Sequence, residues 1–293
     1  MLLASRDLLG CCHAWIAWRD WASWLAVQFR RWSKTIGDRW RITLKIGNWN
    51  LERADPSQDR CLAIREHMAA VDADVWVFTE THELVGPGDR YSAAFSGEPD
   101  RQSKPGERWV GIWSKLPVQP LPSFVSDSAR CAAARLVHPE FGDIVVYGCV
   151  LPWHGSKWRD TSSAGGAAFE AALDLQRSDW KRLRTEFANA MMIVAGDFNQ
   201  DLASRHYYGS KKNRLLLEKM LEEEELEAVT AADHDPVARD SPPYACIDHI
   251  CVSRSSQWRL LSTKRWPDSG KPDKRLSDHF CIVAELGLDK RTD

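Results

Sequence analysis

From Arg41 onward, the spacing of apolar and polar residues is regular enough to predict the elements of a folded domain. Short apolar runs and alternating segments predict strands, because successive side chains of a strand point to opposite faces. The predicted strands are Ile42–Trp49, Val75–Glu80, Trp109–Ser114, Arg130–His138, Asp143–Leu151, Met191–Ala195, Ala245–Ser253, Trp258–Arg265 and Phe280–Leu286. Helical spacing predicts helices over Pro56–Ala70, Ala167–Ala190 and Lys211–Glu227. The segment Gly86–Gly106 is rich in glycine, proline and charge, so we expect it to be mostly loop.

The order of these elements indicates the fold class. Strands mixed with helices over roughly 250 residues predict one α/β domain with large sheets. The apolar fraction of 44% is enough for a sizeable core. We therefore divide the chain of 293 residues into an N-terminal extension, residues 1–40, and a domain covering residues 41–288.

The extension, residues 1–40, is rich in tryptophan and interleaved with charged residues. A spacing of about three residues between its aromatic side chains predicts a helix with a broad aromatic face. Three interpretations stay open: an amphipathic helix at a membrane surface, a helix packed on the domain or on a partner protein, and residues added by a misplaced start codon. Charged residues interrupt every long apolar run, so neither a signal peptide nor a transmembrane helix is predicted.

The net charge and the cysteines indicate which partners and which cellular compartment to expect. The net charge is −2, so a nucleic-acid partner would need a local patch of lysine and arginine. The eight cysteines show no Cys-x-x-Cys spacing, and several lie in apolar runs, where cysteine behaves as a small hydrophobe. These features favour a reducing compartment. We expect a cytoplasmic location, with association to a membrane surface through residues 1–40 as the open alternative.

Five short polar segments, each at the end of an apolar run, carry the candidate chemistry. They are Asn48–Glu52, Phe78–Thr81, Gly196–Asn199, Ile247–His249 and Ser277–His279. Together they offer oxygen and nitrogen ligands for a divalent metal, with a histidine beside it. Hydrolysis of a phosphate ester needs a cation near the phosphoryl oxygens, a group that deprotonates water, and stabilisation of the leaving oxygen. Because the segments can supply all three, they predict phosphoester hydrolysis.

Two carboxylates are placed by strands at the rim of a sheet, where ligands collect. Glu80 and Asp197 each follow an apolar run, and Gly196 permits a tight exit from its strand. Mg²⁺ prefers oxygen ligands and keeps several waters, so one or two carboxylates plus an amide are enough to hold it. Asp278 is a further candidate ligand.

The other side chains of these segments can orient the reacting groups. Asn50 and Asn199 supply amides that hold a phosphoryl oxygen or orient a carboxylate. His279 is the candidate acid–base or charge-stabilising group. Asp248 can accept a hydrogen bond from its ring and fix its tautomer. Three further polar residues are expected to have structural roles, namely His82, His249 and Asp201.

The order of these motifs resembles the signature of the endonuclease/exonuclease/phosphatase superfamily over roughly Arg41–Leu286. The motifs are Trp49-Asn50, Glu80-Thr81, Gly196-Asp197-Phe198-Asn199, Ile247-Asp248 and Ser277-Asp278-His279. The resemblance implies a DNase-I-like fold, a four-layer α/β sandwich of two packed mixed β-sheets flanked by helices. It also implies that Glu80 binds Mg²⁺ or Mn²⁺, with Asn50, Glu52 and Asp278 nearby.

The same resemblance implies the roles of the reacting groups. Asp197 would align or activate the attacking water, and Asn199 would help to hold the phosphate. His279 would contact the scissile phosphate, with Asp248 as its partner.

One position departs from the pattern of the superfamily. After the strand that here covers Ile144–Val150, members usually offer a histidine or tyrosine near the phosphate. In this chain Val150 occupies that place. His154 or Trp153, a few positions later, would have to substitute for it. This departure weakens the case for a role in abasic-site repair and leaves metal-dependent ester cleavage unaffected.

These observations predict a Mg²⁺- or Mn²⁺-dependent phosphoesterase, with a nuclease as the leading interpretation and nucleic acid as the expected partner. The alternatives are a phosphatase or phospholipase acting on inositol phosphates or sphingolipids, and a non-catalytic scaffold that kept the fold. We expect the loops Gly86–Gly106 and Trp153–Gly166 to select the substrate, because loops carry specificity on a rigid scaffold. Both loops contain basic residues, and Trp153 and Trp158 are candidates for stacking on bases.

Overall fold

The computed structural model describes residues 42–255, 257–268, 270–273 and 276–288. The predicted extension, residues 1–40, lies outside the described residues, so its predicted helix and its contacts stay predictions. The chain from Thr43 onward forms one compact unit. Within the described residues, no helix has the length and apolar content needed to cross a lipid bilayer.

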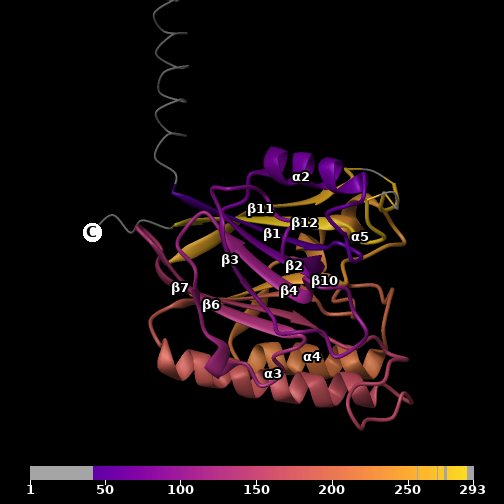
Figure 1. Ribbon diagram of the computed structural model, residues 1–293. Helices are drawn as coiled ribbons and strands as arrows, with labels where there is room; N and C mark the ends of the chain where they lie inside the picture. Colours follow the sequence, from indigo (N-terminus) through magenta and orange to yellow (C-terminus); the bar gives the residue numbers. More distant parts are fainter. Residues whose placement is uncertain (1–41, 256, 269, 274–275, 289–293) are drawn as a thin grey trace, which may run out of the picture. The chain divides into compact units, whose positions relative to one another are not determined.

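Two six-stranded sheets form the centre of the described unit (Figure 1). The first has the strand order β11-β12-β1-β2-β4-β3, and the second has the order β5-β6-β7-β8-β10-β9. The strands of the first sheet are β1 (Thr43–Asn50), β2 (Val75–His82), β3 (Ser92–Phe95), β4 (Glu107–Ser114), β11 (Trp258–Trp266) and β12 (Cys281–Leu288). Those of the second are β5 (Gln119–Pro120), β6 (Cys131–His138), β7 (Gly142–Val150), β8 (Met191–Asp197), β9 (Leu226–Ala228) and β10 (Asp248–Ser253).

Helices cover the outer face of each sheet (Figure 1). The first sheet is covered by α2 (Arg60–Val71), and the second by α3 (Ala167–Glu186) and α4 (Lys211–Glu223). Three shorter helices lie in connections: η1 (Pro122–Phe124), η2 (Ala232–His234) and α5 (Pro236–Asp240). The predicted fold class, two mixed sheets flanked by helices in four layers, is confirmed.

Three hydrophobic clusters fill the three interfaces between these layers. In β2, Val75 and Val77 pack between the sheets, whereas Trp76 and Phe78 pack toward α2. Both faces of the strand are therefore buried, which explains why its sequence is an uninterrupted apolar run rather than an alternating one. The same division occurs in β7, where Val146 faces the other sheet and Tyr147 faces the helices.

One parallel pair of strands lies near the middle of each sheet. β1 and β2 are parallel and are joined through α2, and β7 and β8 are parallel and are joined through α3. Parallel strands need such a crossover connection, and it leaves both carboxyl ends at the same edge of the sheet. The motif residues Asn50, Glu80 and Asp197 lie at or near carboxyl ends, and Asp248 and His279 lie at the starts of antiparallel strands, so the topology delivers all five to one rim.

Two local predictions need correction. The segment Gly86–Gly106 contains β3, whose residues pair with β4. The helix predicted to reach Glu227 ends at Glu223, and β9 follows it. A left-handed backbone at Glu225, with φ of 49°, turns the chain out of the helix and allows this pairing.

Candidate active site

Residues from five segments meet at the rim formed by the strand ends. Asn50 is the last residue of β1, and Glu80 lies near the end of β2. Asp197 ends β8 and is paired in register with Asp248, the first residue of β10. His279 lies two residues before β12. Residues separated by up to about 230 positions in the sequence therefore share one site, as the motif order implied.

The two sheets are tied together directly beneath this rim. The buried amide of Asn48 donates from Nδ2 to the backbone oxygens of Gly196, at 2.9 Å, and His249, at 3.2 Å. His249 is itself buried, and its Nε2 lies 3.0 Å from the backbone oxygen of Gln200. A side chain at Gly196 would place Cβ 1.9 Å from the carbonyl oxygen of Cys149, so only glycine fits here. These residues hold the frame of the site and do not reach its surface.

The carboxylate of Asp197 is buried and held by three N–H donors. Asn50 donates from Nδ2 to Oδ2 at 3.2 Å, and Asn199 donates from its backbone N to Oδ1 at 2.9 Å and from Nδ2 to Oδ2 at 3.1 Å. Burial raises the pKa of Asp197 to about 7, and the nearby carboxylate of Asp248 acts in the same direction. His279 opposes this rise without cancelling it. Near neutral pH, Asp197 can therefore both hold and release a proton.

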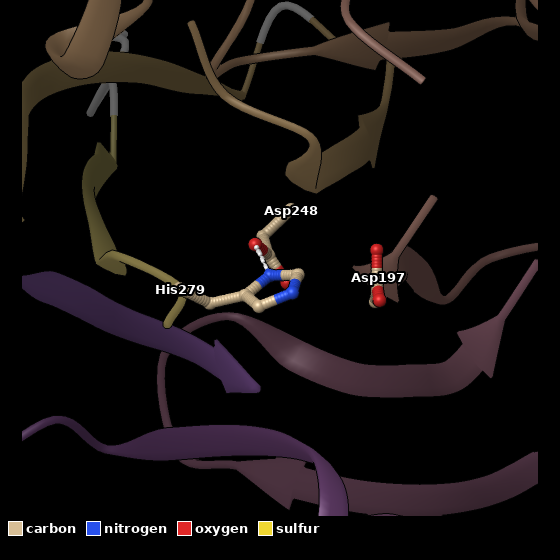
Figure 2. A group of neighbouring side chains, drawn as sticks. All are labelled: Asp197, Asp248 and His279. Carbon is tan, nitrogen blue, oxygen red and sulfur yellow. Dashed lines mark hydrogen bonds and ion pairs between the residues drawn. The ribbon is translucent and has the colours of Figure 1, made fainter. Parts of the chain in front are cut away.

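His279 and Asp248 form a hydrogen-bonded pair beside Asp197 (Figure 2). The Nδ1 atom of His279 lies 2.7 Å from Oδ2 of Asp248, and Figure 2 shows the other ring nitrogen directed toward Asp197. The backbone N–H of His279 donates to Oγ of Ser277 at 3.1 Å, and that hydroxyl donates to the backbone oxygen of Asn50 at 2.6 Å. Asp248 thus holds the ring, and Ser277 links the backbone of His279 to the end of β1.

The surrounding carboxylates keep the imidazole of His279 charged. Burial by itself lowers the pKa of His279, since it disfavours the cation. Asp248 outweighs that effect, with further contributions from Asp197 and Asp278, and together they raise the pKa of His279 to about 10. At neutral pH the ring is therefore a cation that can face a phosphoryl oxygen.

Glu80 has an unusual backbone conformation and lines a small cavity. Its φ is 44°, in the left-handed region, and the following residues resume the pairing with β4. Such a conformation costs on the order of 1–3 kcal/mol for a residue other than glycine, and strain of this kind concentrates at functional sites. Nε of Arg53 lies 3.0 Å from the carboxylate of Glu80. Both residues line a cavity of about 140 Å³ together with Asn199, Arg130 and Trp153, which we call the Glu80 cavity.

Two predicted metal ligands lie toward the edge of the site. The carboxylate of Glu52 is 3.6 Å from Arg60 and is half exposed, while its backbone N–H donates to Oδ1 of Asn50 at 2.8 Å. Asp278 is also half exposed, and its Oδ1 lies 3.9 Å from Nε2 of His279. Glu52 therefore orients Asn50 through its backbone, and Asp278 adds negative charge beside the histidine.

The segment after β7 differs from expectation. Val150 lines the Glu80 cavity, at the place where a polar residue was expected. Trp153 lines the same cavity and is 52% exposed, so it is available to a substrate. His154 is exposed and is not among the residues lining that cavity. The expectation that Trp158 stacks on bases is wrong, because its ring is buried and its Nε1 donates to Asp127 at 3.0 Å.

Most of the basic residues in the two expected substrate loops have acidic partners. These ion pairs are Arg90–Asp72, Arg101–Glu107 at 3.1 Å, Lys104–Asp55 at 2.9 Å and Arg159–Asp127 at 3.7 Å. Arg108, at the start of β4, pairs with Glu83 at 2.7 Å. Arg53 and Arg130 line the Glu80 cavity, where Arg53 contacts Glu80 and Arg130 lies 3.0 Å from Asp100. Reasoning from the sequence missed both, although Arg53 directly follows one of the motifs.

Comparison with known proteins agrees with this geometry. The family model described as "Endonuclease/Exonuclease/phosphatase family" matches residues 47–279. The chain belongs to this family. No curated protein matches the sequence at a significant level.

Solved structures share the fold of this endonuclease/exonuclease/phosphatase domain at low sequence identity. A family protein from Bacteroides thetaiotaomicron has a TM-score of 0.57 and 17% identity, with 85% of this chain and 96% of that chain covered. The endonuclease domain of TRAS1, a telomere-specific non-LTR retrotransposon, has a TM-score of 0.55 and 15% identity, with 85% and 100% covered. The human Nocturnin catalytic domain with bound sulfate has a TM-score of 0.56 and 17% identity, with 85% and 98% covered.

The donor atoms at the rim suit the divalent metals that the endonuclease/exonuclease/phosphatase family generally uses. Within the described residues, one group of three potential metal-binding side chains lies close together: Asp197, Asp248 and His279, whose ligand atoms are all within 4.8 Å. His279 is a charged hydrogen-bond donor here, and an imidazole that keeps both ring protons cannot bind a metal. Oδ1 of Asp248 is buried without a hydrogen-bond partner. Oxygen donors from carboxylates and from Asn50 are what a hard cation such as Mg²⁺ prefers.

Proposed function

We propose that this protein is a divalent-metal-dependent phosphodiesterase that hydrolyses nucleic acid. The observation that carries the proposal is the triad in Figure 2: a buried carboxylate, Asp197, beside a charged histidine held by a second carboxylate, Asp248. A carboxylate beside a positively charged imidazole suits a reaction in which water loses a proton while a phosphoryl group gains negative charge.

Asp197 is the group that takes the proton from water. Its pKa of about 7 lies near neutral pH, which is the condition for efficient general base catalysis at that pH. The N–H donors of Asn50 and Asn199 fix the direction of its oxygens. Water oxygen then attacks phosphorus, the proton moves to Asp197, and the bond from phosphorus to the leaving oxygen breaks.

His279 stabilises the charge that develops on the phosphoryl group. Because Nδ1 is engaged by Asp248, the proton on Nε2 is the one available to a phosphoryl or leaving oxygen. Asn199, whose amide also donates to the backbone oxygen of Leu151 at 3.0 Å, is positioned to contact the same phosphate.

Glu80 and Asn50 would hold the metal, with Asp278 and Glu52 at the periphery. When bound, the cation supplies charge neutralisation on the phosphoryl oxygens and lowers the pKa of coordinated water. Arg53 would have to exchange its contact with Glu80 for one with the substrate or solvent.

Two observations support nucleic acid as the substrate class. Trp153 is exposed at the Glu80 cavity beside Arg53 and Arg130, and this combination of an aromatic ring with cations suits bases and backbone phosphates. One protein with the same fold is an endonuclease domain. We further propose a cytoplasmic location, with residues 1–40 reserved for contact with a membrane surface or a partner.

The test is an activity panel on plasmid, single-stranded DNA, RNA, inositol phosphates and sphingomyelin, each with Mg²⁺, with Mn²⁺ and with EDTA. We expect cleavage of a nucleic acid that EDTA abolishes and added Mg²⁺ or Mn²⁺ restores. A Glu80→Gln variant, which keeps the size of the side chain, should need more metal for half-maximal rate. Full turnover in EDTA would overturn the metal assignment. Turnover of inositol phosphates or sphingomyelin alone would favour the phosphatase or phospholipase alternative, and inactivity on every substrate would favour the scaffold.

A further inference from the structure

A second cavity, of about 330 Å³, adjoins His279. Asp248, Asp278 and His279 line it, so a group bound there lies next to the phosphate that His279 is proposed to contact. Its lining also includes the aromatic residues Tyr207, Tyr244 and Phe280. We call this cavity the tyrosine pocket.

The aromatic side of the tyrosine pocket is a connected set of rings. The rings of Tyr207 and Tyr244 meet edge to face with centroids 5.7 Å apart, and Tyr244 meets Phe280 in the same way at 6.3 Å. Tyr207 is 39% exposed, so its ring remains open to an incoming group. Phe280 and Tyr244 therefore back Tyr207, which presents the free aromatic surface.

The loop carrying Tyr207 is fixed by a buried carboxylate. Oδ2 of Asp201 accepts the backbone N–H groups of Tyr207 at 3.0 Å and Tyr208 at 2.7 Å, and His206 lies 2.9 Å from the same oxygen. Asp201 itself is fully buried. A side chain held in place in this way loses little freedom when a ligand binds, which favours a dedicated contact over an incidental one.

The chemistry of the tyrosine pocket distinguishes among the groups that a phosphodiester can carry. An inositol ring needs polar partners around its whole edge, whereas this pocket combines the polar side chains of Asp248, Asp278, His279 and Lys271 with the exposed ring of Tyr207. A quaternary ammonium group needs open aromatic faces, but the guanidinium of Arg265 already lies 5.1 Å from the ring centre of Phe280. Lys271 also lines the pocket and repels a cation. A planar neutral ring that stacks on Tyr207 meets none of these obstacles.

We propose that the tyrosine pocket binds the nucleobase of the nucleotide adjoining the scissile phosphate, with Tyr207 as the stacking surface and Tyr244 as its support. This inference rests on the proposed nuclease function and adds to it a subsite that recognises a base on the His279 side of the phosphate. Base stacking is tolerant of sequence, because every base offers a π-face. The pocket therefore selects nucleotides as a class rather than one base.

The test compares ligands that differ only in the base. Calorimetric titration of the full chain with Mg²⁺ would use thymidine 5′-monophosphate, 2-deoxyribose 5-phosphate and phosphocholine. We expect the nucleotide to bind roughly 10-fold more tightly than the base-free sugar phosphate, the usual scale for one stacked base. Tyr207→Leu should bring this ratio close to one, and Tyr207→Phe, which keeps the ring, should preserve it. Since Tyr207 lies on the surface of an anchored loop, both variants should keep the melting temperature of the parent.

Three results would overturn the proposal: equal affinity for the two sugar phosphates or no measurable nucleotide binding, tightest binding of phosphocholine, or an unchanged ratio in Tyr207→Leu. The outcome is separable from that of the activity panel. Cleavage of nucleic acid without a base-dependent difference in binding would remove the subsite and leave the nuclease. A base-dependent difference without any cleavage would remove the nuclease and leave a nucleotide-binding pocket.

Discussion

Replacing Asp248 by asparagine tests the electrostatic argument at the centre of the site. The change removes one negative charge and leaves a side chain of the same size beside His279. The pair is separated by 2.7 Å, and the side chain of Asp248 is 4% exposed. A buried hydrogen bond between charged partners contributes about 1.5–3 kcal/mol. At about 1.4 kcal/mol per pKa unit, the pKa of His279 should fall by about one to two units from its value of about 10.

Asp278→Asn is the matched control, because it removes the same charge from the other side of the same ring. Its carboxylate is 3.9 Å from Nε2 of His279 and half exposed, so the pKa of His279 should fall by less than in Asp248→Asn. The measurement is a titration of the labelled imidazole by NMR in EDTA, with His279→Gln used to assign the signal. If Asp278→Asn shifts this pKa as much as Asp248→Asn does, the pairing with Asp248 is not what keeps the ring charged.

The stability and activity of Asp248→Asn should also depend on pH in a defined way. The pKa of His279 is higher in the folded chain than its ordinary value of 6.5, so the pair stabilises the fold fully below pH 6.5 and loses this effect as the pH rises through about 10. Asp248→Asn should therefore lower the melting temperature more at pH 6 than at pH 10. Its kcat should fall by roughly 10-fold at neutral pH, and further at pH 9 where the ring loses its proton.

Four further predictions concern other parts of the chain. Asp197→Asn should lower kcat by about 10²-fold or more. The pKa of Asp197 is about 7 in the folded chain and 3.8 ordinarily, so its ionised carboxylate destabilises the fold as the pH rises through this range. The variant should therefore melt no lower than the parent at pH 8. A lower melting temperature there would contradict the assignment. Gly196→Ala should destabilise the fold by about 3 kcal/mol or more, since Cβ would lie 1.9 Å from a backbone oxygen, and an unchanged urea midpoint would refute this. Burial lowers the pKa of His67 to about 4, so the free energy of unfolding should fall as the pH drops from 6.5 through 4. His67→Phe should reduce this loss in urea titrations, and an equal loss in the parent and the variant would count against it. A chain beginning at Asp38 should keep the melting temperature and kcat/KM on a small soluble phosphodiester, and aggregation or a melting temperature many degrees lower would show that residues 1–40 belong to the core.

The elements that the sequence predicted correctly are those whose pattern reflects burial on a sheet. Val75–Phe78 is apolar throughout because its residues fill both the cluster between the sheets and the cluster under α2. The short strands β3 and β9 escaped prediction, since three or four residues carry no periodic pattern and are ordered by the strands they pair with. For the same reason the end of α4 was misplaced, because helical propensity continues through Glu224–Glu227 while the backbone turns at Glu225.

The candidate site shows a similar division. The motif residues Asp197, Asn199, Asp248 and His279 are brought within hydrogen-bonding range of one another or of shared partners. His154 was expected near the phosphate because it follows Val150 closely in the sequence. Closeness in sequence does not determine which way the side chains of an exposed turn point. Trp158 was expected at the surface with Trp153, but a buried carboxylate draws its ring inward.

The sequence by itself determined the order of the longer strands and helices and nominated the candidate reacting groups, because buried strands need apolar residues and phosphoryl chemistry needs carboxylates and a histidine at strand ends. Only the tertiary structure decided which of these groups interact. Asn50 reaches Asp197 across 147 positions of sequence, and such a contact depends on how two sheets pack. The charge of His279, the contact between Arg53 and Glu80, and the tyrosine pocket were also settled at that level. Burial and the distance between charges set these properties, and neither is a property of a residue alone.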